Sequence, residues 1–189
     1  MLDQSVTGGF ASPSIDAAHV FRAAMSAMAR PGRIEAVAGA EAPAPMSAAA
    51  AALVLTLCDA ETPLFLAADH DTSDIRAWIA FHTGAPIVAR AQAQFALGRW
   101  EDLLPLAGYA IGTPEYPDRS ATLIVEMETL EAEGPRLTGP GIETEAALSL
   151  PETEAFEANH MLFPQGLDFY FTAGTQLASM PRTTKVEAG

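Results

Sequence analysis

Segments that resemble β-strands alternate along this chain with segments of helical periodicity, and this alternation is what most limits the folds open to it. Strand-like apolar segments are expected at 64–67, 87–89, around Phe95, and at 121–127, 167–172 and 177–180. Helical segments are expected at 14–30, 48–57, 74–81 and 152–162, with a short helix at 100–106. The alternation predicts an α/β protein layered around one sheet.

The segment 121–127 is the clearest strand, because aliphatic and β-branched residues dominate it. Leu123 and Val125 would share one face of the sheet, since side chains alternate along a strand. Glu126 and Glu128 point the other way, so we expect that face to be solvated near the end of the strand.

The first two helical segments have recognisable ends. Ser14 and Ser47 are the expected N-caps, because a serine side chain can accept a hydrogen bond from a free backbone N–H. Pro31 ends the first helix, since proline disfavours helical geometry in the residue before it. An apolar stripe at spacings of three and four residues is expected along the first helix: Ala18, Phe21, Met25 and Met28.

The length of 189 residues suits one domain, with residues 1–13 as an N-terminal arm. A chain of this length buries roughly 70% of the surface exposed by its unfolded form, so it needs no disulfide or metal ion to fold. Its one cysteine, Cys58, cannot form an internal disulfide. Residues 1–10 lack the character of a signal peptide, and no apolar run is long enough for a membrane span, which predicts a cytoplasmic protein without a membrane segment.

The charge of the chain argues against nucleic-acid binding. Acidic residues number 24 and basic residues 10, giving a net charge of −14 that repels a phosphate backbone. Only 18% of residues are charged, against about 25% in an average soluble protein. The surface must therefore be apolar in places, which favours a buried subunit interface.

Several cofactor and metal sites are excluded by residue counts. Lys185 is the only lysine, and its place near the C-terminus fits neither a pyridoxal phosphate Schiff base nor a Walker A loop. No two histidines have the i, i+4 spacing of a helical zinc site, and one cysteine cannot supply a thiolate cluster. We therefore expect no cofactor and no structural metal.

The segment from Asp69 to Asp74 has the carboxylates of a cation loop but not its spacing. An EF-hand loop starting at Asp69 needs glycine at its sixth place and glutamate at its twelfth, where this chain has Asp74 and Ala80. A solvated turn, with Asp74 as the cap of the helix that follows, is the expected structure.

Three short segments are candidate ligand or partner sites. The turn around Gly139 and Gly141 could present backbone N–H groups to a phosphate, or be a tight structural turn. Arg182, Thr183 and Thr184 form a sensible anion-binding set, but they could equally pin the C-terminal strand to the core or to a partner.

His82 and Thr83 lie in an expected loop between a helix and a strand, where functional residues often lie. The alternative is a histidine satisfied by local backbone groups. No residue of the chain stands out as catalytic.

Motifs in a fixed order along 9–186 give the chain a resemblance to a known family. They are Phe21-Arg22 with Met25, Ala27-Met28, Pro31-Gly32, Leu57 with Asp59, Thr62-Pro63, 81–86, 137–142, Phe163-Pro164 with Gly166 and Asp168, and 181–184. Each motif is weak alone, but the ordered series resembles the H subunits of carbon–phosphorus lyase, the PhnH family of phosphonate metabolism.

This resemblance implies a single three-layer α/β/α fold similar to the large domain of pyridoxal-phosphate-dependent transferases, without the cofactor. It implies a homodimer that joins the G, I and J subunits of the core complex. That complex forms ribose 1-phosphonate 5-triphosphate from ATP and an alkylphosphonate, with the chemical steps assigned to other subunits. The expected role is thus a non-catalytic interaction subunit, inactive alone. The alternative is a nucleotide- or phosphonate-binding, or catalytic, component that uses the Arg182 anion site.

Overall fold

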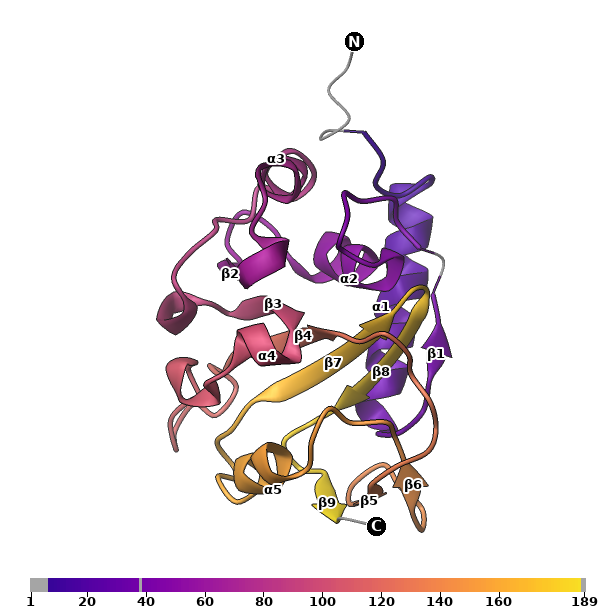
Figure 1. Cartoon of the computed structure of the whole chain (residues 1–189), viewed down its shortest axis with the longest axis vertical. Coiled ribbons are helices and arrows are strands. Elements are labelled where there is room, and N and C mark those ends of the chain that lie inside the picture. Colours follow the sequence, from indigo (N-terminus) through magenta and orange to yellow (C-terminus); the bar gives the residue numbers. More distant parts are fainter. Residues whose placement is uncertain (1–6, 38, 188–189) are drawn as a thin grey trace.

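A six-stranded mixed sheet forms the centre of the computed structural model, which describes residues 7–37 and 39–187 (Figure 1). The strand order is β1-β8-β7-β4-β3-β2. The strands are β1 (Glu35–Ala36), β2 (Leu64–Leu66), β3 (Phe95–Arg99), β4 (Thr122–Glu126), β7 (Asp168–Ala173) and β8 (Gln176–Met180). β2, β3, β4 and β7 run parallel, while β8 is antiparallel to β7 and β1 is antiparallel to β8.

A second, three-stranded sheet lies beside the first near the C-terminus (Figure 1). Its order is β6-β5-β9, formed by β5 (Arg136–Thr138), β6 (Ala146–Ala147) and β9 (Lys185–Glu187). Both pairings are antiparallel, with Leu137 opposite Val186 in one and opposite Ala146 in the other. Through this sheet, β5, which precedes the glycine-rich turn at 139–141, pairs with β9 at the end of the described chain.

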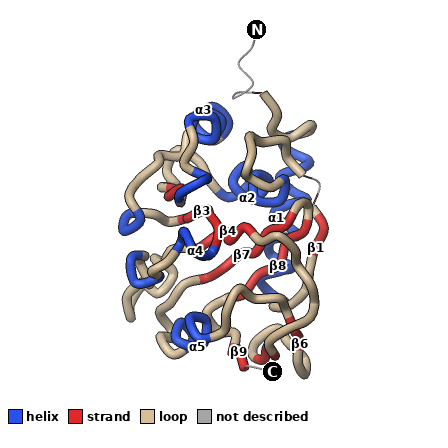
Figure 2. Tube along the Cα trace, in the orientation of Figure 1, coloured by secondary structure: helices blue, strands red, loops and turns tan. Residues whose placement is uncertain are grey.

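In the described part of the chain, five α-helices surround the central sheet (Figure 2). They are α1 (Pro13–Ala29), α2 (Ala48–Leu57), α3 (Ser73–His82), α4 (Trp100–Leu103) and α5 (Glu154–His160). The predicted α/β class is therefore confirmed as a mixed α/β fold.

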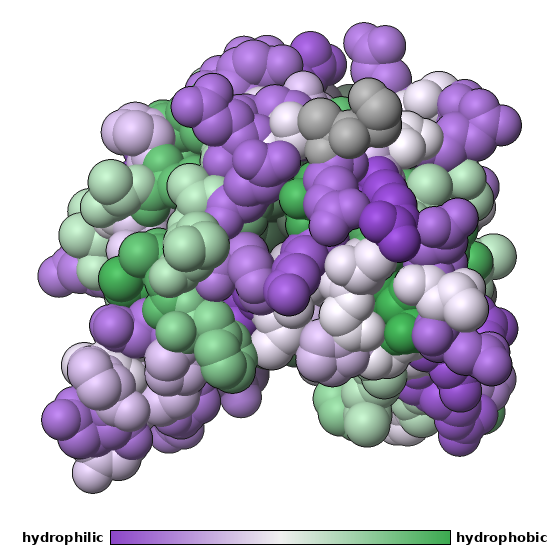
Figure 3. Space-filling view, turned by 90° about the horizontal axis from the view of Figure 1, so that it is seen from below, coloured by the Kyte–Doolittle hydropathy of each residue, from purple (hydrophilic) through white to green (hydrophobic). Residues whose placement is uncertain are grey.

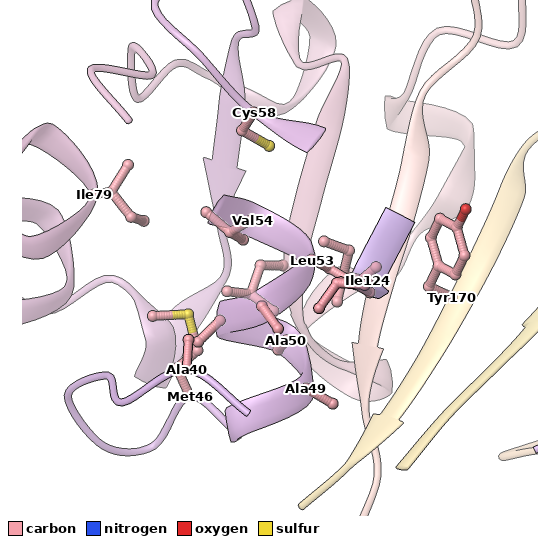
Figure 4. Close-up of a cluster of buried hydrophobic side chains, with 14 of the residues drawn as sticks. Ala40, Met46, Ala49, Ala50, Leu53, Val54, Cys58, Ile79, Ile124 and Tyr170 are labelled. Atoms are coloured by element: carbon pink, nitrogen blue, oxygen red, sulfur yellow. The ribbon is translucent and has the colours of Figure 1, made fainter. Parts of the chain in front are cut away.

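One face of the central sheet packs against α1, α2 and α3. Helix α2 is almost wholly buried, and its Leu53 and Val54 are fully enclosed next to Ile124 of β4 (Figure 4). The four consecutive alanines 49–52 are also fully buried, because small side chains allow the helix to approach its neighbours closely. The position of α2 is thus fixed by packing on all sides.

The opposite face carries an aromatic cluster that fixes α4 and α5. Phe169 and Phe171 of β7 are fully buried against Phe156 of α5. Trp100 stacks on Phe156 at 4.8 Å, and its Nε1 donates a hydrogen bond to Glu152 at 2.7 Å. The alternation of Leu123 and Val125 on this face with Ile124 on the other agrees with the predicted strand.

Helix α1 differs from its predicted packing. Its buried residues are Val20, Ala24 and Ala27, whereas Phe21 and Met25 of the predicted apolar stripe are 49% and 57% exposed. The small alanine side chains let α1 approach its neighbours closely, so the larger apolar residues remain on the outer side. Phe21 and Met25 of the stripe therefore face away from the core, whereas Met28 packs partly against it.

The capping predictions had mixed outcomes. Ser47 caps α2 as predicted, with its hydroxyl accepting from Ala50 N at 3.1 Å. The N-cap of α1 is Ser12 rather than Ser14, with Pro13 at the first helical position. Thr72 rather than Asp74 caps α3.

Two further local predictions need correction. The segment 87–89 forms only an isolated bridge between Ile87 and Leu64, not a strand. Glu126 is not in a solvated position, because its side chain is only 9% exposed and contacts residues far away in the sequence.

Candidate functional site

Arg182 lies at the end of β8 and closes a network of internal contacts. All three guanidinium nitrogens donate within the chain: Nε and Nη2 to Asp168, Nη2 also to Ser120, and Nη1 to Pro117 O at 2.7 Å. The backbone N–H of Arg182 adds a bond to Asp168 at 2.9 Å. This geometry favours the pinning interpretation of Arg182 over the anion-site interpretation.

The structure brings Gly139 and Gly141 next to the segment that follows Arg182. Both glycines have positive φ, and a Cβ on Gly139 would lie 3.0 Å from the carbonyl oxygen of Thr183. A Cβ on Gly141 would collide with the carbonyl oxygen of Ala29 at the end of α1. The turn thus packs tightly against two other segments, as expected for a structural turn.

Thr184 is buried beside this turn. Within the described part of the chain, its Oγ1 has no hydrogen-bond partner. Thr183 is only partly buried. These residues and the glycines form one region, which does not include His82.

His82 ends α3 and packs against the N-terminal segment. Its ring lies 4.8 Å from that of Trp78 and 5.0 Å from that of Phe81, and a Cβ on Gly9 would lie 2.7 Å from its Cε1. Burial lowers the pKa of His82, and a hydrogen bond with the backbone of Thr7 opposes this shift. Thr83 is satisfied locally, donating to Ile79 O and accepting from Ala85 N.

A pocket that the sequence did not predict lies at the carboxyl ends of the parallel strands. Its volume is about 480 Å³. Its lining includes His70, which comes after β2, and the last residues of β3 and β4, Arg99 and Glu126. Ligands of open α/β sheets bind at this edge. Arg99 and Glu126 end their strands and His70 ends a short 3-10 turn after β2, so no local motif marked the pocket in the sequence, where 69–74 was interpreted as a turn alone.

His70 and Glu126 form the buried part of this pocket. His70 is fully buried, and its Nε2 lies 3.9 Å from Oε1 of Glu126, which is too long for a hydrogen bond. Glu126 accepts hydrogen bonds from Ser47 N at 2.6 Å and from the Thr172 hydroxyl at 3.0 Å. Its carboxylate thus joins α2 to β7 and also faces the pocket.

Two exposed apolar surfaces could contact other proteins. The first, the α1 surface, consists of Ile15, Phe21 and Met25. The second, the α5 surface, consists of Leu104, Met161, Leu162 and Phe163, and continues into an apolar groove of about 670 Å³ between 104–111 and α5. Apolar side chains gather on the side of the molecule seen at the left of Figure 3.

Two classes of site were not found in residues 7–37 and 39–187. In this part of the chain, no group of three or more His, Cys, Asp or Glu side chains could hold a metal ion. The helices described there are all too short or too polar to cross a membrane.

The sequence matches a known family over nearly its full length. The profile of a family described as "Bacterial phosphonate metabolism protein (PhnH)" matches residues 8–187. The chain belongs to the PhnH family. The resemblance inferred from the ordered motifs is therefore confirmed.

Two relatives of the chain have names that describe them as subunits of larger assemblies. The chain is 41% identical to the "Alpha-D-ribose 1-methylphosphonate 5-triphosphate synthase subunit PhnH" of Rhizobium meliloti (strain 1021), over 97% of this chain and 96% of the relative. It is 29% identical to the "Putative C-P lyase subunit protein HtxG" of Stutzerimonas stutzeri, over 88% of this chain and 83% of the relative. Both are named as subunits.

Several of the motifs that carry the resemblance fall into two groups in the structure. Pro31-Gly32, 137–142 and 181–184 lie at the tightly packed turns between α1, β5 and β9. Phe21, Met25 and Phe163 instead lie on the two exposed apolar surfaces. The first group is tightly packed within the fold, and the second is exposed on its surface.

Proposed function

We propose that this chain is a non-catalytic interaction subunit of a carbon–phosphorus lyase core complex in phosphonate catabolism. In this role it supports the formation of ribose 1-phosphonate 5-triphosphate from ATP and an alkylphosphonate. It acts in the cytoplasm as one domain, and its partners are the G, I and J subunits. Residues 1–6 of the expected N-terminal arm lie outside the described residues, and Pro13 already belongs to α1. Its fold is related to the large domain of pyridoxal-phosphate-dependent transferases, without their cofactor.

The match to a subunit of the ribose 1-methylphosphonate 5-triphosphate synthase is the observation that carries this proposal. At 41% identity it covers 97% of this chain, so the likeness is not confined to one motif. Exposed large apolar side chains support the interaction role, because a contiguous apolar patch on a protein surface commonly marks a protein interface.

The α1 surface suits a homodimer contact. Phe21 and Met25 stand about one helical turn apart on the same side of α1, the arrangement that packs two helices together. A symmetric contact would bring the same patch of both copies together. The α5 surface is then available to a different subunit.

The internal contacts of Arg182 weaken the alternative of an anion site at 182–184. A guanidinium that already donates from all three nitrogens would have to give up Asp168 or Ser120 to hold a phosphonate. A ligand-binding role is better supported at the pocket beside Glu126.

Co-expression with the G, I and J subunits, with an affinity tag on the I subunit, tests the interaction role. We expect the chain to co-purify in stoichiometric amount and Met161→Glu to reduce its recovery. An Ala107→Glu variant in the adjoining groove tests the same surface without touching the exposed methionine. If the chain and both variants were absent from the complex under every expression condition, the interaction role would be wrong.

A further inference from the structure

His70 is a buried histidine whose hydrogen-bonding capacity is not met within the chain. It is 0% exposed, and neither ring nitrogen has a hydrogen-bond partner among the residues that the structure describes. Burying a polar group without a partner is costly. Oε1 of Glu126 is 3.9 Å from Nε2, which is too long for a direct hydrogen bond, so this ring nitrogen remains unsatisfied within the described residues.

The surroundings of His70 form a pocket of the size that small molecules occupy. The volume of about 480 Å³ falls within the usual range for such sites, which is about 300–1,000 Å³. The pocket lies where β3 and β4 end, and His70 follows β2 after Ala68, which has an unusual positive φ of 35°. Strained backbone of this kind is concentrated at binding sites.

The charges of the lining select among ligand classes. Glu101, Glu126 and Glu128 outnumber the single cation Arg99, so a free phosphate or phosphonate is disfavoured at the inner end. Carboxylates accept hydrogen bonds readily from sugar hydroxyls, as in the recognition of ribose by α/β folds. Arg99 is exposed at the outer part of the pocket and could hold an anionic group on the same ligand.

From these observations we infer that the pocket between β3, β4 and the start of α2 binds a ribose 5-phosphate moiety. A sugar hydroxyl donates to the carboxylate of Glu126 on the side of His70, and the phosphate lies toward Arg99. The site itself rests on the geometry of the pocket. The choice of ribose over other polyols rests on the proposed function, since the relative is named for a ribose product.

Calorimetric titration of the purified chain with ribose 5-phosphate tests the inference. We expect saturable binding, with 2-deoxyribose 5-phosphate at least about tenfold weaker because one hydrogen bond to a charged group is lost. Glu126→Gln should weaken binding by a similar factor, whereas Glu133→Gln, at an exposed position outside the pocket, should not. Circular dichroism and the melting temperature establish that the Glu126 variant is folded.

Arg99→Ala provides a second variant that does not depend on the Glu126 network. It should weaken binding of ribose 5-phosphate but leave the difference between ribose and deoxyribose compounds intact. Absence of binding at 10 mM ribose 5-phosphate, or equal affinity for inorganic phosphate, would overturn the inference. Either result would leave co-purification with the partner subunits unaffected, so the two proposals fail separately.

Discussion

Arg182 and Asp168 form an ion pair that joins the end of β8 to the start of β7, with side chains only 11% and 23% exposed. Asp168 also accepts from the backbone N–H of Arg182, so the pair fixes both the side chain and the turn that follows β8. A charge that is left largely buried without its partner is strongly destabilising. The pair is therefore central to the stability of this region.

We predict that Arg182→Ala lowers the free energy of unfolding by about 2–4 kcal/mol, because Asp168 would keep its partial burial but lose its counter-charge. Denaturant unfolding measures this change. Arg136→Ala is the matched control, since its ion pairs with Glu145 and Glu187 are exposed and exposed pairs contribute only about 0–1 kcal/mol. Equal effects of the two substitutions would contradict the assigned role of Arg182.

The N-cap of α2 offers a second stability test. Ser47→Ala should cost about 1 kcal/mol, because Ala50 N would lose its acceptor. Ser12→Ala is the control, since Ser12 is the N-cap of α1 but its side chain makes no capping bond. A difference in melting temperature of about 2–4 °C between the two variants is expected for a chain of this size. Indistinguishable melting temperatures would argue against the cap.

The contacts of His82 predict a pH effect on stability. Burial lowers the pKa of His82 in the folded chain below its ordinary value of 6.5, so the unfolded chain binds a proton more readily. This contribution to stability is therefore present above pH 6.5 and is lost as the pH falls through the lowered pKa. On going from pH 7.5 to pH 5.5, the melting temperature of His82→Gln should fall by less than that of the wild type. His19→Gln is the control for the loss of one imidazole, because His19 is exposed. If the melting temperature of His82→Gln fell with pH as much as that of the wild type, the assigned role of His82 would be wrong.

The α1 surface predicts the oligomeric state. The wild-type chain should scatter light as a dimer at micromolar concentration, and a Phe21→Glu and Met25→Glu double variant should be a folded monomer whose melting temperature is lowered only by the loss of dimerisation. Both substitutions are at exposed positions, so they should not disturb the core. Met161→Glu, at an equally exposed methionine on the α5 surface, should remain dimeric. A monomeric wild type would contradict the homodimer.

Local sequence signals predicted the parts of the fold that depend on local chemistry. The boundaries of α2 follow from Ser47 and the apolar run after it, and β4 follows from its aliphatic residues. The buried face of α1 was missed, because periodicity gives weight to large residues such as Phe21 while the core here selects Ala24 and Ala27. Which of two apolar faces is buried depends on what packs against the helix.

The pocket was missed for a different reason. Glu126 interacts with Ser47, which is 79 residues away, and lies near His70, so no local pattern marks either residue as functional. Only the parallel order of β2, β3 and β4 places their carboxyl ends together. The resemblance, in contrast, was available from the sequence because it depends on the order of motifs rather than on their contacts.

In the proposed role, this chain supports the chemistry of its complex without performing it. Adenine release from ATP and methylphosphonate, in the presence of magnesium, tests the claim with the purified chain alone and with the G, I and J subunits added. We predict no release by the chain alone and release by the assembled complex. Adenine release by the purified chain alone, abolished by a single substitution such as Glu126→Gln or Arg182→Ala, would contradict the account and establish this chain as a catalytic subunit.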